Sequence, residues 1–267
     1  MRKKMAIEFF LYPIIGIISG LLAGFFGVGG GLVMVPALHF IYGYLGYNDD
    51  ISIPLSLGTA LGCIVINSLS AIPVHNKNKN ISWSNFVKLF IGIAFGSVIG
   101  AFISVEAEKE IFKKVFALFI FLISLRMFFK IKDKENAKNL SLAVSVPFGG
   151  VVGAISTTFA IGGGIFIGPF LRLMGENMRR AVGTSVVCTL PVGLIGALTY
   201  LYLGLDVEGL PDYSFGYVNF LSLFCIVIFS SFSSRLGAWL TQKVDEKVFQ
   251  TLYALQLVPI FFYWLLA

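Results

Sequence analysis

Two glycine-rich stretches contain the residues of this chain whose type and spacing could bind a ligand. FFGVGGGLVMVP (25–36) has four glycines within five residues, and FAIGGGIFIGP (159–169) has a matching triplet. Both interrupt apolar sequence, and a new helix is expected after each, at Leu32 and at Ile165. A helix N-terminus carries unpaired N–H groups and about half a positive charge. Two such ends facing one another predict an anion-binding site built from backbone N–H groups. The candidate residues are Gly29, Gly30, Gly31, Gly162, Gly163 and Gly164.

Helix packing is the alternative role for these glycines, since small residues let transmembrane helices approach closely. Packing or a hinge therefore stays open for both triplets. The spacing by four of Gly16, Gly20 and Gly24 predicts packing of this kind. A dinucleotide-binding loop is a poor fit, because Gly27, Gly29 and Gly31 lack the GxGxxG spacing, and a nucleotide-phosphate loop is excluded, because no GK[ST] motif follows.

Hydroxyl side chains near the breaks are further candidates, because a hydroxyl donates to an anion without imposing a fixed charge. Thr59, Thr184 and Ser185 lie just after a glycine near the start of a predicted span. The alternative for these three is a hydrogen bond back to a carbonyl of their own helix. Thr158, together with Thr157, stands just before the second triplet and is a candidate to line the same cavity.

Arg172 and His39 occupy equivalent positions, eight residues past the last glycine of each triplet. That spacing is about 12 Å along a helix, so both are expected nearer the mouths than the centre. Arg172 is a candidate to attract anions, with snorkelling to the interface as its alternative. Snorkelling is the favoured interpretation for His39, and His75 is predicted to be a solvated residue of a basic loop.

The predicted spans offer little acid–base or redox chemistry. They are short of carboxylates, so no proton carrier can be named, and protons are only a candidate coupling ion. Cys63 and Cys188 occupy matched positions and are expected to be small apolar fillers. Because the chain has no CxxC pair, no metal set and no nucleophile–base pair in a span, it predicts neither an enzyme nor a metal or cofactor.

The composition indicates a membrane protein. Of the 267 residues, 57% are hydrophobic and 13% are charged, whereas about 25% are charged in a soluble protein. The net charge of +6 is spread among loops, so no nucleic-acid partner is expected. The expected partners are the lipid bilayer and a small anionic substrate.

The elements that position the candidate residues are predicted from hydropathy. Two apolar regions, 7–42 and 140–174, contain the breaks and are too long for one ordinary crossing. Single spans, each long enough to cross a bilayer, are predicted at 53–73, 84–104, 112–131, 181–203, 214–233 and 249–266.

The chain also repeats itself. With a shift of 133 residues, GVGGGLVMVPALH (27–39) lies on AIGGGIFIGPFLR (160–172), and with a shift of 125, GTALGC (58–63) lies on GTSVVC (183–188). We expect two membrane repeats, 1–133 and 134–267. Basic residues swap sides between equivalent loops, which predicts inverted repeats. The expected fold is all-α and polytopic, each repeat having a glycine-broken re-entrant or discontinuous helix and three transmembrane helices.

The orientation follows from the basic residues. With both termini outside, most Lys and Arg fall on the cytoplasmic side, as the positive-inside rule requires. The rival arrangement, with eight full crossings and the N-terminus inside, divides them almost evenly. We therefore expect a multi-pass protein of the plasma membrane with both termini outside.

A known family shares this pattern. In both halves a glycine break precedes a proline, Pro36 or Pro169, and GTA or GTS opens the next helix. This doubled pattern resembles the TauE/SafE sulfite exporter family over essentially the whole chain. The resemblance implies a carrier of sulfur-containing anions such as sulfite, sulfoacetate or related sulfonates, often an exporter. Ala60 stands where the family often has a hydroxyl, which implies that the two half-sites contribute unequally.

These observations predict a secondary transporter that alternates access around a midplane anion site. The alternatives are an anion channel built on the same breaks and a carrier for a small carboxylate without sulfur.

Overall fold

Helices account for nearly all of the regular structure. The computed structural model describes residues 2–127, 140–245, 248, 251–252, 255 and 258–263. The first half of the chain contains α1 (Arg2–Phe26), α2 (Gly31–Leu45), α3 (Asp49–Lys77), α4 (Trp83–Glu106) and α5 (Lys109–Met127). The second half contains α6 (Leu142–Thr158), α7 (Gly164–Leu173), α8 (Met178–Leu203), a hairpin of β1 (Ser214–Phe215) and β2 (Val218–Asn219), and α9 (Phe220–Leu240). The described residues between 248 and 263 are helical and form the C-terminal helical segment.

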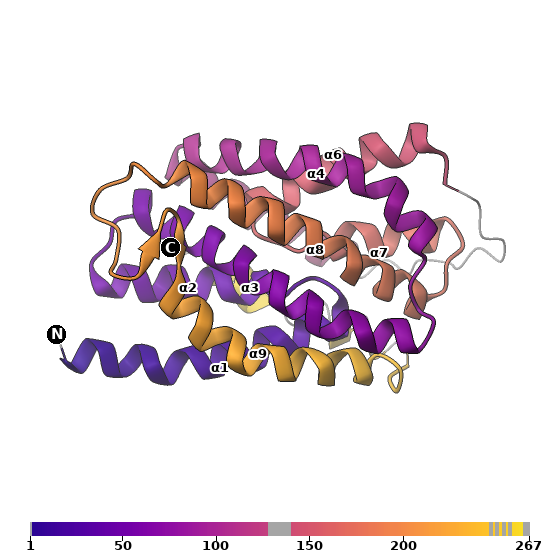
Figure 1. Cartoon of the computed structure of the whole chain (residues 1–267), viewed down its shortest axis with the longest axis horizontal. Helices are drawn as coiled ribbons and strands as arrows, with labels where there is room; N and C mark the ends of the chain where they lie inside the picture. The colour runs from indigo at the N-terminus through magenta and orange to yellow at the C-terminus, as the bar shows by residue number, and fades with distance from the viewer. Residues whose placement is uncertain are drawn as a thin grey trace.

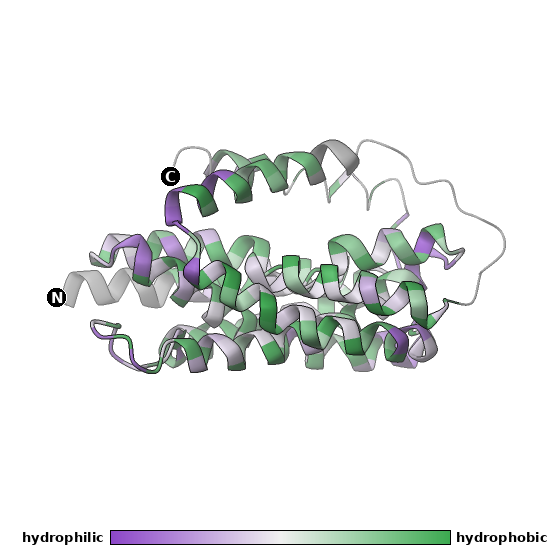
Figure 2. Ribbon diagram, turned by 90° about the horizontal axis from the view of Figure 1, so that it is seen from above, coloured by the Kyte–Doolittle hydropathy of each residue, from purple (hydrophilic) through white to green (hydrophobic). Residues whose placement is uncertain are grey.

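The long helices have the dimensions of membrane spans. Within the described residues, α3, α4, α8 and α9 are each long and apolar enough to cross a bilayer. Apolar residues fill the middle of the molecule, and hydrophilic residues gather at the two ends of its long axis (Figure 2). The predicted all-α, polytopic membrane fold is therefore confirmed.

The two glycine-broken regions form helical hairpins, α1–α2 and α6–α7. Helix α2 begins at Gly31 and α7 at Gly164, each one residue before the predicted start. Helix α2 occupies the end of the molecule near the N-terminus, whereas α7 occupies the opposite end (Figure 1). Each hairpin thus returns toward the end from which its first helix came, so the two breaks lie in the interior.

Close glycine contacts hold each hairpin against a long helix from the other half of the chain. Helix α1 packs along α9, and α6 packs along α4. A Cβ at Gly16 would lie 2.5 Å from the carbonyl oxygen of Ile226, and a Cβ at Gly20 would overlap that of Ser230. The predicted packing role of Gly16, Gly20 and Gly24 is confirmed. Helix α4 uses Gly92, Gly96 and Gly100 in the same way against α6.

Helix α5 covers the second break from one side, in a layer set apart from the long helices (Figure 2). The rings of Phe116 and Phe119 stack on Phe159, with centroids 4.6 Å and 4.9 Å apart. Phe159 directly follows α6, so this aromatic cluster fixes the chain as it enters the break.

The span predicted at 214–233 begins too early. Residues 214–219 form the β1–β2 hairpin, and α9 starts only at Phe220, where the Asn219 side chain accepts a hydrogen bond from Ser222 N at 2.9 Å. Hydropathy counts the apolar hairpin residues as part of the span, but Asn219 caps the helix after them. The ends of the spans predicted at 112–131 and 249–266 lie outside the described residues.

Candidate functional site

The two glycine breaks touch one another through their backbones. Gly162 N donates a hydrogen bond to the carbonyl oxygen of Val28 at 2.9 Å. A Cβ added at Gly29 would lie 3.2 Å from the Cα of Gly162. There is no room for a side chain between the breaks, because backbone from one hairpin occupies the space beside the other.

This contact is repeated at equivalent positions of the two halves. A Cβ at Gly31 would overlap the carbonyl oxygen of Ala160, and a Cβ at Gly164 would overlap that of Gly27. The two pairs are related by the same shift of 133 residues that aligns the triplets. Both halves therefore require glycine at the first residue of the second helix, for the same steric reason.

The N-termini of α2 and α7 both lie at this meeting point. Their N-cap residues, Gly30 and Gly163, adopt left-handed backbone with φ of 86° and 75°. Among the described residues, no side chain caps either N-terminus. Because α2 and α7 extend in opposite directions from the centre (Figure 1), their positive dipole ends face the same region. This arrangement suits a small anion.

Two buried hydroxyl groups lie in the last turn of α6, just before the second break. Ser156 Oγ and Thr157 Oγ1 are fully buried and have no hydrogen-bond partner within the described part of the chain. Ser156 Oγ is 3.4 Å from the position that a Cβ of Gly163 would take. Buried hydroxyls are normally paired, so an orphan hydroxyl beside the α7 N-terminus, with a second orphan on the next residue, points to a ligand position.

The predicted candidate Thr158 faces elsewhere. Its Oγ1 donates to the carbonyl oxygens of Ala154 at 2.9 Å and Gly100 at 3.0 Å. Thr158 thus supports the packing of α6 on α4. The sequence Ser156-Thr157-Thr158 indicates that a hydroxyl lies near this break. Which of the three points at the break depends on helical phase, and the sequence analysis missed Ser156 for that reason.

The first break is held by Asn67, whose side-chain nitrogen and oxygen both have hydrogen-bond partners. Its Nδ2 donates to Gly29 O at 3.4 Å, and its Oδ1 accepts from Ser230 Oγ at 2.6 Å. Ser68 Oγ on α3 and Thr189 Oγ1 on α8 are 2.5 Å apart, and Thr189 packs against Gly162 of the second break. The two breaks are therefore unequal, since the orphan hydroxyls belong to the second. Asn67 is the single amide side chain in the predicted apolar span 53–73, and this could have marked it as a candidate functional residue.

Of the three hydroxyls predicted after glycines, only Ser185 reaches a break. Its Oγ lies 2.7 Å from the position of a Cβ at Gly27 and donates to Val182 O at 2.8 Å. Thr59 Oγ1 accepts from Asn219 N at 2.9 Å, and Thr184 Oγ1 accepts from Ser82 N at 2.8 Å. Thr59 and Thr184 are thus engaged at the starts of α9 and α4.

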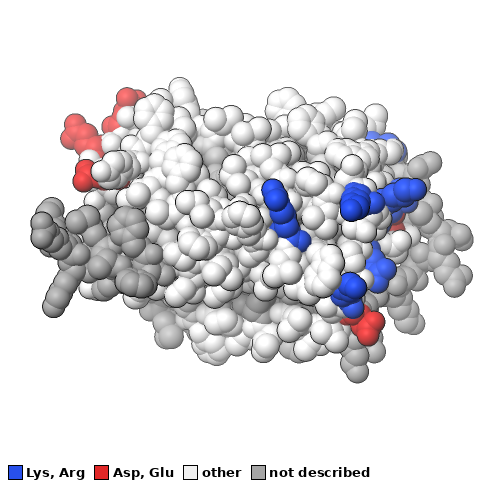
Figure 3. Space-filling view, turned by 60° about the horizontal axis from the view of Figure 1, so that its bottom comes forward, with Lys and Arg blue, Asp and Glu red and all other residues white. Residues whose placement is uncertain are grey.

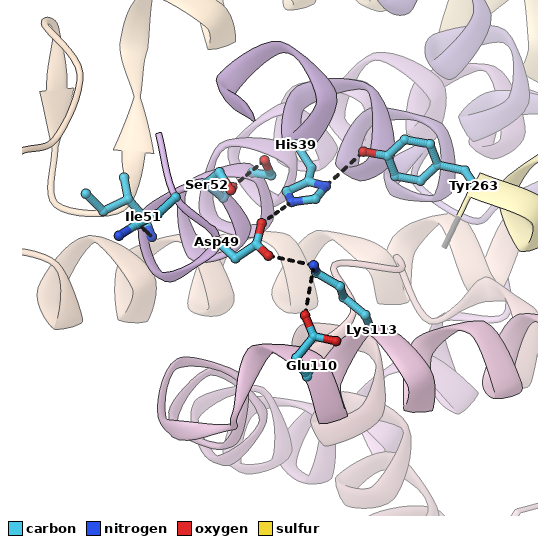
Figure 4. A network of polar contacts seen from close by, with 9 residues as sticks. His39, Asp49, Ile51, Ser52, Glu110, Lys113 and Tyr263 are labelled. Atoms are coloured by element: carbon cyan, nitrogen blue, oxygen red, sulfur yellow. Dashed lines mark hydrogen bonds and ion pairs between the residues drawn. The ribbon is translucent and has the colours of Figure 1, made fainter. Parts of the chain in front are cut away.

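His39 and Arg172 are both buried near the ends of their half-helices. Rather than snorkelling, His39 bridges three elements, with Nε2 3.0 Å from Asp49 Oδ1 and Nδ1 2.8 Å from Tyr263 Oη (Figure 4). Lys113 Nζ lies 2.5 Å from Asp49 Oδ2 and ties α5 to the same group. Arg172 lies in the last turn of α7, and the structure leaves it at the end of that helix rather than at the break.

The two ends of the molecule differ in charge (Figure 3). The exposed loop between α8 and β1 carries only acidic charges, Asp206, Glu208 and Asp212. The opposite end, where the loops after α3, α7 and α9 lie, carries the exposed basic side chains Lys77, Lys79, Arg179, Arg180 and Lys243.

The sequence comparisons agree with this architecture. Residues 12–263 match the sulfite exporter TauE/SafE family. The chain belongs to the TauE/SafE family. This TauE/SafE protein is 33% identical over 250 residues to a probable membrane transporter protein of Haemophilus influenzae, covering 92% of this chain and 94% of the relative. It is 34% identical over 254 residues to a probable membrane transporter protein of Methanocaldococcus jannaschii, covering 91% and 92% of the two chains.

A third relative, a probable membrane transporter protein of Bacillus subtilis, is 26% identical over 275 residues, covering 95% of this chain and 96% of its own. No solved structure gives a significant match. The TauE/SafE protein is therefore a multi-pass membrane transporter protein, because its family, its relatives and its apolar helices agree.

Proposed function

We propose that this TauE/SafE protein exports small sulfur-containing anions, such as sulfite, sulfoacetate or related sulfonates, by secondary transport. The observation that carries the proposal is the meeting of two uncapped helix N-termini, with the unpartnered hydroxyls of Ser156 and Thr157 in the adjoining turn of α6. Backbone N–H groups and hydroxyls bind an oxyanion without a fixed positive charge. A ligand held in this way can also leave, as a transporter requires. The sulfur-containing class itself rests on the family.

The anion site is expected to lie on the α7 side of the meeting point. Asn67 and Ser185 at the first break have hydrogen-bond partners, whereas Ser156 and Thr157 at the second do not. The proposed ligands are the N–H groups at the start of α7, the Ser156 and Thr157 hydroxyls, and the facing backbone of Gly29, Gly30 and Gly31. Ser185 lines the other side of the break at Gly27.

Alternating access between two inverted repeats, 1–133 and 134–267, would expose this site to each side in turn. The helix pairing supports it, because α1 packs on α9 and α6 on α4, while α3 and α8 pack on one another at the centre. The direct contact between the breaks favours a carrier over a channel, since a continuous pore would need space between them.

We propose the plasma membrane as the location, with both termini outside. Basic residues favour the cytoplasmic side of a membrane. The basic end of the molecule carries the loops after α3, α7 and α9, so this end would face the cytoplasm. The N-terminus lies at the opposite end (Figure 1).

Ligand-induced thermal stabilisation of the purified protein tests the site. Sulfite, sulfoacetate and acetate would be titrated against wild type and against a Ser156→Ala, Thr157→Val double variant. Each hydroxyl bonded to a charged ligand contributes about 1.5–3 kcal/mol, so we expect the double variant to bind at least tenfold more weakly. Its own stability should hardly change, because neither hydroxyl has a partner in the absence of ligand.

Ser145→Ala is the matched control, since Ser145 is buried on the same helix and its hydroxyl already donates to Ser141 O at 2.8 Å. We expect this variant to bind like wild type. Equal affinity of the double variant would move the site away from the α7 N-terminus. Stabilisation by acetate alone would favour the carboxylate alternative, and no stabilisation of wild type by any anion would contradict the proposed substrate class.

A further inference from the structure

His75 is a buried titratable group at the first break. The sequence predicts a solvated loop residue, but the structure places it in the last turn of α3 with no exposed surface, because α1 and the end of α9 cover this turn. Its Nε2 lies 3.4 Å from the carbonyl oxygen of Gly24, three residues before Gly27. Its Nδ1 is buried and has no hydrogen-bond partner among the described residues.

The partner of His75 is the C-terminal end of α1. Helix α1 ends at Phe26, so its last carbonyls lack partners within the helix. His75 Nε2 donates a hydrogen bond to Gly24 O, and Thr241 Oγ1 donates to Phe25 O at 2.8 Å. The helix dipole makes this end negative, which favours a protonated histidine beside it.

The second break has a matching contact without a group that titrates near neutral pH. Tyr200 is related to His75 by the shift of 125 residues, and Thr157 to Gly24 by the shift of 133. Tyr200 Oη donates to Thr157 O at 3.4 Å and also bonds to Ser104 Oγ. A tyrosine stays neutral at physiological pH, whereas a histidine changes charge in that range.

We propose that His75 binds the proton that this protein exchanges together with its anion. The two helix ends at the first break would then act on different ligands. The negative C-terminal end of α1 would favour the proton, and the positive N-terminal end of α2 would point toward the anion. The proposal rests on the proposed function, because it assigns the coupling ion of the same site.

The orphan Nδ1 indicates how the proton acts. In the neutral ring Nε2 carries the hydrogen that Gly24 O accepts, and Nδ1 holds a lone pair. A proton from water adds to Nδ1, which makes the ring cationic and turns Nδ1 into a donor that has no acceptor here. A buried donor without an acceptor is costly. Protonation therefore favours a conformation in which Nδ1 reaches water at the basic end, and the same proton returns to water when the ring is neutral again.

Within the described part of the chain, no ion pair involves His75. Asn80 links the end of α3 to the residues just after α9. Asn80 N donates to His75 O at 3.0 Å, and Asn80 Nδ2 donates to Gln242 Oε1 at 2.8 Å. At this end of the molecule the charged side chains of Lys77, Lys79, Arg179, Arg180, Lys243 and Asp245 are exposed, as is that of Arg235 further back on α9.

The test compares anion binding and proton movement in wild type, His75→Gln and His39→Gln. Glutamine keeps an N–H donor for Gly24 O but does not titrate. His39, the other histidine, belongs to the network with Asp49 and Tyr263 and serves as the control. Sulfoacetate is the probe because its charge stays constant between about pH 5.5 and about pH 8, and binding is measured across this range.

We expect the wild-type and His39→Gln affinity for sulfoacetate to fall by up to tenfold for each pH unit above the histidine titration, because proton and anion bind together. The His75→Gln affinity should vary by less than about twofold. In proteoliposomes with a trapped pH dye, a sulfoacetate gradient should move protons through wild type and His39→Gln. His75→Gln should still exchange sulfoacetate but move no protons.

The outcomes separate the two proposals. Failure of wild type to bind or carry any tested anion contradicts the proposed function. Anion transport by wild type without proton movement, or undiminished proton movement by His75→Gln, overturns the role of His75 and leaves the proposed function intact. If His75→Gln does not fold, calorimetry of wild type in buffers of unlike protonation enthalpy decides, since zero proton uptake on binding at every pH would overturn the inference.

Discussion

Four backbone positions at the meeting of the breaks show why the triplets must be glycine. Gly31 and Gly164 lie against carbonyl oxygens of the other hairpin, where a Cβ has no space. Gly30 and Gly163 adopt left-handed backbone, which costs other residues about 1–2 kcal/mol. Packing and ligand binding are therefore not competing explanations, because the close packing is what brings the two N-termini together.

The steric requirement predicts a difference between two alanine substitutions on α7. Gly164→Ala would push a methyl group into the carbonyl of Gly27 and should lower the free energy of unfolding by about 1–3 kcal/mol or more. Gly168→Ala, one turn further along, has nothing within 4 Å of the new methyl group and should change stability by less than about 0.5 kcal/mol. Thermal unfolding in detergent measures both, and equal stability would contradict the backbone contact.

At the residue scale the sequence predicted the breaks, the helix starts and the pairing of the triplets, because glycine patterns report local backbone. It did not predict that Asn67, Ser156 and His75 gather at the breaks. Those contacts depend on helical phase and on which helix packs against which, and hydropathy carries neither. Thr59 and Thr184 illustrate the same limit, since their hydroxyls serve the starts of α9 and α4.

Among the elements, α2, α3 and α5 are tied together by charge at the end near the N-terminus. Asp49, at the start of α3, contacts both His39 of α2 and Lys113 of α5 (Figure 4). The Lys113 side chain is 9% exposed and that of Asp49 is 38% exposed. Loss of one partner would leave Lys113 nearly buried with Glu110 as its remaining carboxylate in this network.

A double-mutant cycle on this ion pair should reveal coupling. We expect Asp49→Asn and Lys113→Met each to lower the melting temperature, and the double variant to lose less than the sum. Because Asp49 is partly exposed, solvent screening limits the expected coupling to about 1 kcal/mol. Strictly additive effects would mean that the pair does not link α3 to α5.

Hydropathy located the long elements well, since crossing a bilayer demands long apolar runs of any sequence. The boundary of α9 was wrong because an apolar hairpin adjoins it. The broken regions were recognised by length, and the return of each hairpin to its own end became visible only in the arrangement of α2 and α7 (Figure 1).

For the whole molecule, the separation of charge predicts one orientation in the membrane. Single cysteines at Glu208 and Lys77, both exposed and at opposite ends, would be placed in a background with Cys63, Cys188 and Cys225 replaced by alanine. A membrane-impermeant maleimide should label Glu208→Cys on intact cells and Lys77→Cys only after permeabilisation. The reverse pattern, or labelling of both on intact cells, would contradict both termini being outside.

The most direct test of the central claim is to locate a bound anion. Crystals grown with selenite or selenate, which replace the sulfur of an oxyanion with selenium, would give an anomalous peak at the ligand position. We predict a peak within hydrogen-bond reach of the α7 N-terminus and the hydroxyls of Ser156 and Thr157. A peak elsewhere, for example beside Arg172, would contradict the claim that the meeting of the two breaks is the anion site.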